Sequence, residues 1–189
     1  DEYKKKTPGQ VYTTKNQYIV DAIAPIANKN AVINNIILMI GDGMGVGHVF
    51  AAMSANNNQL YLEYADQTGL QKTQSKNKFN TDSAAAGTAL ACGKKTNNGF
   101  IGMTADSLSI KSILELAADN GKSTGLVAAS KITHATPASF IAHVPSRKQY
   151  EDIATFFLSD VIDVFIGATV WITGGGRKSK LRETPYFET

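Results

Sequence analysis

One stretch, residues 35–47 (NIILMIGDGMGVG), constrains the fold of this chain more than any other. The apolar run Ile36–Ile40 stops at a glycine-rich turn that carries one carboxylate, Asp42. A short apolar run bounded by turn residues is typical of a strand buried on both faces, as in a parallel sheet. Because helix-compatible residues follow the turn, it would lie at the carboxyl end of a strand, where open α/β sheets bind ligands. We therefore predict that Asp42 lies at a ligand site.

The turn differs from the two common nucleotide-binding loops. Val46 stands where a dinucleotide fingerprint requires its third glycine, and no Gly-Lys-Ser/Thr follows as in a P-loop. A carboxylate in the loop would also repel a phosphate group unless a cation lay between them. Asp42 therefore indicates a metal site. The alternative is an aspartate that only caps the following helix.

Length and composition indicate an ordinary globular protein. The 189 residues are 43% hydrophobic and 19% charged, and the formal net charge is +3. The basic clusters Lys4–Lys6 and Arg177–Arg182 have no interleaved aromatic residues, so we expect no nucleic-acid binding. No apolar run has the length of a membrane span. The single cysteine, Cys92, rules out an internal disulfide.

Strand-like and helix-like segments alternate along the chain, which predicts an α/β fold with a mostly parallel sheet flanked by helices. We expect residues 1–31 to form a leader segment and residues 32–189 to form the domain. Beyond the first strand and helix, the predicted elements are an edge strand over 69–75, a helix ending at Gly93, a helix over 109–120, a strand over 123–129, a helix over 146–158 and a strand over 161–166.

The helix predicted to end at Gly93 has a serine, Ser83, at or near its amino end. Residues 81–83 (Thr-Asp-Ser) are of types preferred at a helix N-cap, and the body of the helix is alanine-rich. The hydroxyl of Ser83 would lie where the helix dipole and backbone N–H groups favour an anion. A serine nucleophile also needs a base or a metal, and this one lacks the Gly-x-Ser-x-Gly elbow of serine hydrolases. Ser83 is either an activated nucleophile or a capping serine without a chemical role.

Four motifs, taken together and in this order, make the chain recognisable. They are IGDGMG (40–45), TDSAAAGTA (81–89), THATP (133–137) and HVPSRK (143–148). With them the chain closely resembles the bacterial alkaline phosphatases over about residues 33–167. The resemblance implies an alkaline-phosphatase-like α/β fold. It also implies hydrolysis of phosphate monoesters through a phosphoserine intermediate, with zinc and magnesium as cofactors.

The resemblance assigns three residues to catalysis and substrate binding. Ser83 corresponds to the nucleophile that becomes phosphorylated, and it contacts the substrate. Arg147 corresponds to the guanidinium that clamps the phosphate, and Asp82 to the carboxylate that orients this guanidinium. These roles agree with the chemistry, because a planar guanidinium offers two parallel hydrogen bonds to phosphate oxygens.

The resemblance assigns four residues to metal binding. Asp42 corresponds to the carboxylate that bridges one of two zinc ions and a third metal site. Ser83 corresponds to a zinc ligand, and Thr136 to a ligand of the third site. His134 stands where some family members have Asp and others His, which implies magnesium at that site. Paired metals of this kind activate the attacking oxygen and stabilise the leaving oxygen.

Part of the family's metal shell has no counterpart in the chain. The remaining His and Asp zinc ligands of family members lie downstream of the Arg motif, whereas this chain has no histidine after His143. Asp160 and Asp163 match no family motif, and His48 and His143 match no family ligand. Both zinc sites are therefore incomplete, and we expect an incomplete fold. Residues 168–189 depart from the family pattern and have no predicted role.

Two functions follow from this resemblance. The first is a phosphomonoesterase of which the chain is the amino-terminal half. The second is a non-catalytic truncated fragment that binds phosphate but lacks complete zinc sites. A sulfatase-like or phosphoglycerate-mutase-like enzyme is a remoter alternative, against which the Thr-Asp-Ser and Ser-Arg motifs speak. Residues 1–8 have no apolar signal region, so we expect that the protein either stays in the cytoplasm or is a mature form with its signal removed. Similar enzymes are often homodimers outside the cytoplasm, so the resemblance implies a homodimer in the periplasm or secreted.

Overall fold

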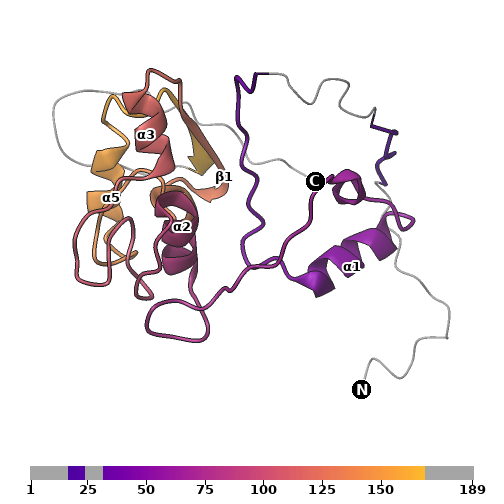
Figure 1. Cartoon of the computed structure of the whole chain (residues 1–189), viewed down its shortest axis with the longest axis horizontal. Coiled ribbons are helices and arrows are strands. Elements are labelled where there is room, and N and C mark those ends of the chain that lie inside the picture. Colours follow the sequence, from indigo (N-terminus) through magenta and orange to yellow (C-terminus); the bar gives the residue numbers. More distant parts are fainter. Residues whose placement is uncertain (1–16, 24–31, 169–189) are drawn as a thin grey trace. The chain divides into compact units, whose positions relative to one another are not determined.

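The computed structural model describes residues 17–23 and 32–168 (Figure 1). The chain forms two compact units, residues 1–71 and residues 72–189. Most of the predicted leader (1–31) and all of residues 169–189 lie outside the described residues, so the boundary at residue 31 stays a prediction. Among the helices of the described ranges, none is both long and apolar enough to cross a membrane.

In the first unit, helix α1 (Val46–Ala55) follows the glycine-rich turn, as predicted. The backbone N–H of Gly45, its N-cap, donates to Nδ1 of His48 at 3.2 Å. The helix ends at Asn56, whose side chain exchanges two hydrogen bonds with the backbone of Tyr18 at 3.0 and 3.2 Å. The Tyr18 ring stacks on Tyr61 of the short 3₁₀-helix η2 (Tyr61–Tyr64). These contacts join residues 17–23 to the end of α1.

The predicted strand over Ile36–Ile40 is wrong as a local element. These residues take no strand conformation, and their exposed fractions run from 37% for Ile40 to 89% for Met39. The predicted edge strand over 69–75 is also absent. A strand is stabilised by hydrogen bonds to a neighbouring strand and by burial of its faces. The described part of the first unit offers neither to Ile36–Ile40, and residues 69–75 span the boundary between the two units.

In the second unit, two strands form the predicted parallel sheet. Strand β1 (Gly125–Lys131) pairs with β2 (Val164–Ala168), with Gly125 opposite Val164. Just before β2, the Asp163 carboxylate accepts a hydrogen bond from the backbone N–H of Thr124 at 2.7 Å. Both strands lie within a few residues of the predicted positions.

In the described part of the second unit, residues 72–168, four helices accompany the sheet. The predicted helix at Ser83 is confirmed, because it begins at Ser83 and ends at Gly93 with a φ of 68°. The predicted helices over 109–120 and 146–158 are shorter than expected. Their N-caps are Ser112 and Gln149, which leaves the residues before them in loops. The bounds are α2 (Ser83–Cys92), α3 (Ile113–Asp119), α4 (Ala135–Ala138) and α5 (Tyr150–Phe156).

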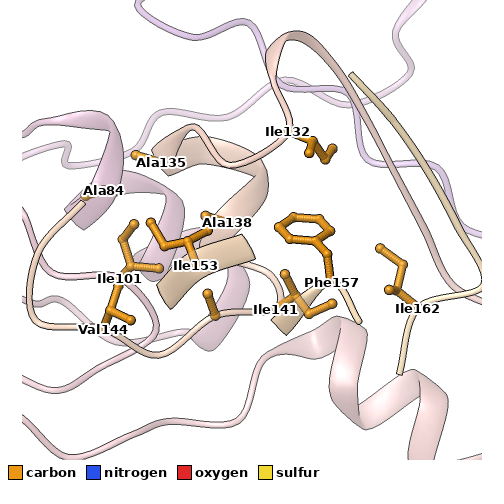
Figure 2. Packing of buried hydrophobic residues seen from close by; sticks show 11 residues of the cluster. Ala84, Ile101, Ile132, Ala135, Ala138, Ile141, Val144, Ile153, Phe157 and Ile162 are labelled. Atoms are coloured by element: carbon orange, nitrogen blue, oxygen red, sulfur yellow. The ribbon is translucent and has the colours of Figure 1, made fainter. Parts of the chain in front are cut away.

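The core of the second unit lies between α2, α4, α5 and the sheet. Figure 2 shows its buried side chains, among which Ile101 and Ile153 are fully buried. Helices α2 and α4 approach closely at Gly87, where an added Cβ would lie 2.7 Å from Ser139 Oγ. This packing places the amino-terminal half of α2 against α4. Two of the motifs found in the sequence, 81–89 and 133–137, are thereby joined.

Candidate active site

The amino end of α2 is built around the carboxylate of Asp82. Its Oδ1 atom accepts a hydrogen bond from the N–H of Ala85 at 2.9 Å and so caps the helix. Its Oδ2 atom accepts from the N–H of Gly99 at 2.9 Å and pairs with Nη1 of Arg147 at 3.3 Å. The side chains of both ion-pair partners are about three-quarters buried, with 25% of Asp82 and 26% of Arg147 exposed. The carboxylate that caps α2 therefore also orients the guanidinium.

Three groups hold Arg147. Its backbone N–H donates to the carbonyl oxygen of Gly99 at 2.7 Å, which fixes the main chain. The guanidinium contacts Asp82 through Nη1, while Nη2 lies 3.3 Å from Nε2 of His134. A guanidinium has only donors, so Nε2 of His134 is the acceptor in this contact. The structure thus joins Asp82, Arg147 and His134 in one hydrogen-bonded row.

Ser83 and Thr136 lie on the two packed helices. Ser83 is the first residue of α2, directly after Asp82, and is partly exposed. Thr136 lies in α4 and is also partly exposed, and its Cα would lie 3.6 Å from a Cβ added to Gly87. Asp42 lies in the first unit, in the turn before α1. Its convergence with the other predicted residues stays a prediction.

Two residues of this site had no predicted role. The side-chain oxygen of Asn98 accepts a hydrogen bond from the backbone N–H of Asp82 at 3.2 Å, and its amide donates to Asn80 at 2.9 Å. Gly99 contacts Asp82 and Arg147 through its N–H and its carbonyl. In the sequence, residues 97–99 (Asn-Asn-Gly) are of residue types that are common in turns, which is the signal for this segment. That signal predicts a turn but not its partners.

The predicted metal ligands do not form a complete site by themselves. Within residues 17–23 and 32–168, no three His, Cys, Asp or Glu side chains come together in a group that could hold a metal ion. The donors are of suitable types, since Asp42 offers a carboxylate, His134 an imidazole and Thr136 a hydroxyl. Structural and catalytic zinc sites need three or four protein ligands. The donors at hand therefore do not fit a complete zinc site.

Comparison with known proteins identifies the family. The family model described as "Alkaline phosphatase" matches residues 33–187. Alkaline phosphatase 4 of Bacillus subtilis is 45% identical over 152 residues, which are 72% of this chain and 33% of the relative. The chain belongs to the alkaline phosphatase family. Alkaline phosphatase 3 of the same organism is 40% identical over 151 residues, 71% of this chain and 32% of the relative. The chain thus spans about a third of the length of these curated relatives.

Solved alkaline phosphatases also share the fold. A variant of the enzyme from the Antarctic bacterium TAB5, with magnesium bound in its M3 site, aligns with a TM-score of 0.65 and 41% identity. The alignment covers 67% of this chain and 37% of the TAB5 chain. The cold-active enzyme from a Shewanella species aligns with a TM-score of 0.62 and 34% identity, over 71% and 36% of the two chains. The predicted fold class, an incomplete alkaline-phosphatase-like α/β fold, is confirmed.

Proposed function

We propose that this chain supplies the phosphate-binding part of an alkaline phosphatase, which hydrolyses phosphate monoesters. The observation that carries the proposal is the Asp82–Arg147 pair at the amino end of the helix that Ser83 begins. A largely buried carboxylate fixes the guanidinium at the amino end of the helix that Ser83 begins, and such a helix end favours anions. A phosphate held by Arg147 would then lie close to the hydroxyl oxygen of Ser83.

In this proposal Ser83 is the nucleophile. Its oxygen forms a bond to phosphorus while the bond between phosphorus and the ester oxygen breaks; the serine hydroxyl gives its proton to solvent, and the departing ester oxygen takes one up from solvent. The product is a phosphoserine and a free alcohol. Water then cleaves the phosphoserine, releases inorganic phosphate and restores Ser83. Arg147 contributes by binding and orienting the phosphate oxygens, since a guanidinium matches them with two parallel donors.

We further propose zinc and magnesium as the cofactors. Asp42, Ser83, His134 and Thr136 would supply part of their ligands, and metals at such a site lower the barrier by activating an oxygen nucleophile and stabilising the leaving oxygen. Magnesium is supported by the TAB5 neighbour, of which a variant with glutamate in place of a histidine binds magnesium in its M3 site. The zinc ligands that the chain lacks would have to come from elsewhere. A homodimer and a periplasmic or secreted location complete the proposal by family resemblance.

A second function is favoured by one specific observation. The described residues bring no group of three or more His, Cys, Asp or Glu side chains together that could hold a metal ion. A non-catalytic fragment that binds phosphate would have this property. It would keep the Asp82–Arg147 pair and lose turnover, because a serine hydroxyl needs a base or a metal for activation.

Two measurements on the purified 189-residue chain test these proposals. We expect little or no hydrolysis of a phosphate monoester with added zinc and magnesium, but weak binding of inorganic phosphate that Arg147→Ala abolishes. Turnover comparable to that of a full-length relative would show that the chain needs no further ligands. Phosphate binding that is unchanged by Arg147→Ala would contradict the proposed clamp.

A further inference from the structure

A polar cluster centred on His143 lies in the same loop segment as Arg147. The Nδ1 atom of His143 lies 2.7 Å from the carbonyl oxygen of Gly102, and its Nε2 atom lies 3.0 Å from Oε1 of Glu115. Only 13% of the His143 side chain and 17% of the Glu115 side chain are exposed. The carbonyl oxygen of Gly102 can only accept a hydrogen bond, so Nδ1 of His143 donates to it, while Nε2 faces the carboxylate of Glu115. His143 therefore bridges two segments.

The helix α3 holds Glu115 in place for this contact. The second carboxylate oxygen of Glu115 accepts a hydrogen bond from the N–H of Ser112 at 2.7 Å, and the Ser112 hydroxyl accepts from the N–H of Glu115 at 3.2 Å. This reciprocal capping box fixes the carboxylate. The ring of Phe156 from α5 meets the His143 ring edge-on, with centroids 5.7 Å apart. The imidazole is thus held in one orientation by two helices.

Gly102, on the other side of the ring, is equally fixed. Its carbonyl also accepts from the N–H of Ile110 at 2.8 Å, and its own N–H donates to Oγ1 of Thr88 in α2 at 2.9 Å. A Cβ at this position would lie 2.1 Å from the carbonyl oxygen of Ala142 and 2.7 Å from His143 Nδ1. Only glycine allows the two segments to approach this closely. This close approach brings Nδ1 of the His143 ring to hydrogen-bonding distance from the carbonyl oxygen of Gly102.

The same two segments carry the phosphate clamp. Ile101 and Val144 exchange two backbone hydrogen bonds, both of 3.0 Å, and the N–H of Arg147 donates to Gly99. The N–H of Gly99 in turn donates to Asp82. Segment 99–102 is therefore paired with segment 143–147 through backbone hydrogen bonds. The Asp82–Arg147 ion pair lies at one end of these paired segments, and the contacts of His143 lie at the other end.

We propose that His143 is a positioning residue for the phosphate clamp. Through its contact with the carbonyl oxygen of Gly102, with the ring oriented by Glu115, His143 fixes the pairing of segment 99–102 with segment 143–147, and so holds Arg147 against Asp82. This inference rests on the proposed function, in which Arg147 binds phosphate. His143 needs no contact with the substrate for this role. Its loss loosens Arg147 and leaves the hydroxyl of Ser83 in place.

Two substitutions of His143, each of which keeps a donor near only one of the two ring nitrogens, test this inference. His143→Asn keeps a donor near the Nδ1 position, toward Gly102, whereas His143→Gln keeps one near the Nε2 position, toward Glu115. Amide hydrogen exchange in the 189-residue chain reports the hydrogen bonds donated by the N–H groups of Val144 and Arg147. We expect His143→Gln to reduce the protection of both amides by about tenfold, which corresponds to the loss of one buried hydrogen bond. We expect His143→Asn to keep the protection of both amides within about threefold of the unchanged chain. Lys111→Ala, at an exposed ion pair beside α3, is the control and should change neither amide.

The exchange of distant amides separates positioning from general stability. The N–H groups of Ala86 in α2 and Ile153 in α5 should keep their protection in both His143 variants. The inference is overturned if His143→Gln leaves Val144 and Arg147 protected. It is also overturned if the variant lowers all four amides equally, because that result describes a residue that only stabilises the fold.

Titration with inorganic phosphate distinguishes failure of this inference from failure of the proposed function. If Arg147→Ala weakens phosphate binding, we expect His143→Gln to weaken it at least about threefold, in the same direction as the loss of amide protection. An effect of Arg147→Ala without any effect of His143→Gln contradicts the inference alone. If Arg147→Ala has no effect, the proposed function fails, and the exchange measurement still decides whether His143 holds the segment.

Discussion

Asp82 uses one carboxylate both to cap helix α2 and to hold Arg147, with Oδ1 on the N–H of Ala85 and Oδ2 at 3.3 Å from Arg147 Nη1. The position of helix α2 and the orientation of the Arg147 guanidinium are thereby linked. The hydroxyl of Ser83 and the guanidinium of Arg147 come from segments far apart in the sequence. Because the carboxylate caps the helix that Ser83 begins and pairs with Arg147, it ties the backbone position of Ser83 to the guanidinium.

Removing this carboxylate should destabilise the second unit. We expect Asp82→Ala to lower the free energy of unfolding by about 1–3 kcal/mol, because the cap of α2, the contact with Gly99 and the partner of a largely buried guanidinium are lost together. Urea denaturation followed by circular dichroism measures the change. Asp119→Ala, which breaks an exposed ion pair with Lys111, should lower the free energy of unfolding by clearly less than Asp82→Ala. Equal losses for the two variants would contradict this assignment.

Packing between α2 and α4 should not tolerate a methyl group at Gly87. Gly87→Ala places a Cβ 2.7 Å from Ser139 Oγ and 3.0 Å from Ser139 Cβ, and both residues are buried. We expect a net destabilisation of about 1–2 kcal/mol, since the overpacking outweighs the better helix propensity of alanine. Ser139→Ala removes the closer atom, so the cost of Gly87→Ala should be smaller in that background. A more stable Gly87→Ala single variant would show that the helices can move apart freely.

The thiol of Cys92 should react slowly while the chain is folded. Burial, and to a smaller extent the charge of Glu115, raises the pKa of Cys92 from 9.0 to about 11. Because the thiolate is the reactive form, alkylation by iodoacetamide at pH 9 should be about fiftyfold slower in the folded chain than in urea. The stability that comes from keeping the thiol neutral is fully present below pH 9 and is lost as the pH rises through about 11. Equal alkylation rates in the two states would exclude a raised pKa.

The sequence predicted elements well where local chemistry determines them. Helix α2 has a capping aspartate before it, an alanine-rich body and a glycine in the left-handed conformation after it, and all three signals lie within the element. Strand positions were less accurate, because the register of β2 depends on its pairing with β1. Ile36–Ile40 has the composition of a buried strand, but composition supplies no neighbouring strand. Its exposure reflects the need of a strand for partners.

The site was predicted from motifs and not from contacts. The motifs indicated Asp82 and Arg147, which the structure brings together across 65 residues. The contact of His134 with Arg147 and that of His143 with Glu115 depend on tertiary packing, so no spacing in the sequence announces them. His143 matched no family ligand, and its role in the structure lies in contacts to the backbone of Gly102 and to α3.

The most direct test of the central claim is to identify the residue that carries phosphate during turnover. A chain of family length, made by continuing these residues with the carboxyl-terminal part of Bacillus subtilis alkaline phosphatase 4, is incubated with zinc, magnesium and a phosphate monoester and then quenched in acid. Mass spectrometry of its peptides locates the phosphoryl group. We predict one phosphoryl group on Ser83, absent from Ser83→Ala and reduced in Arg147→Ala. Hydrolysis of the ester without a label on Ser83, or a label that persists in Ser83→Ala, would contradict the account.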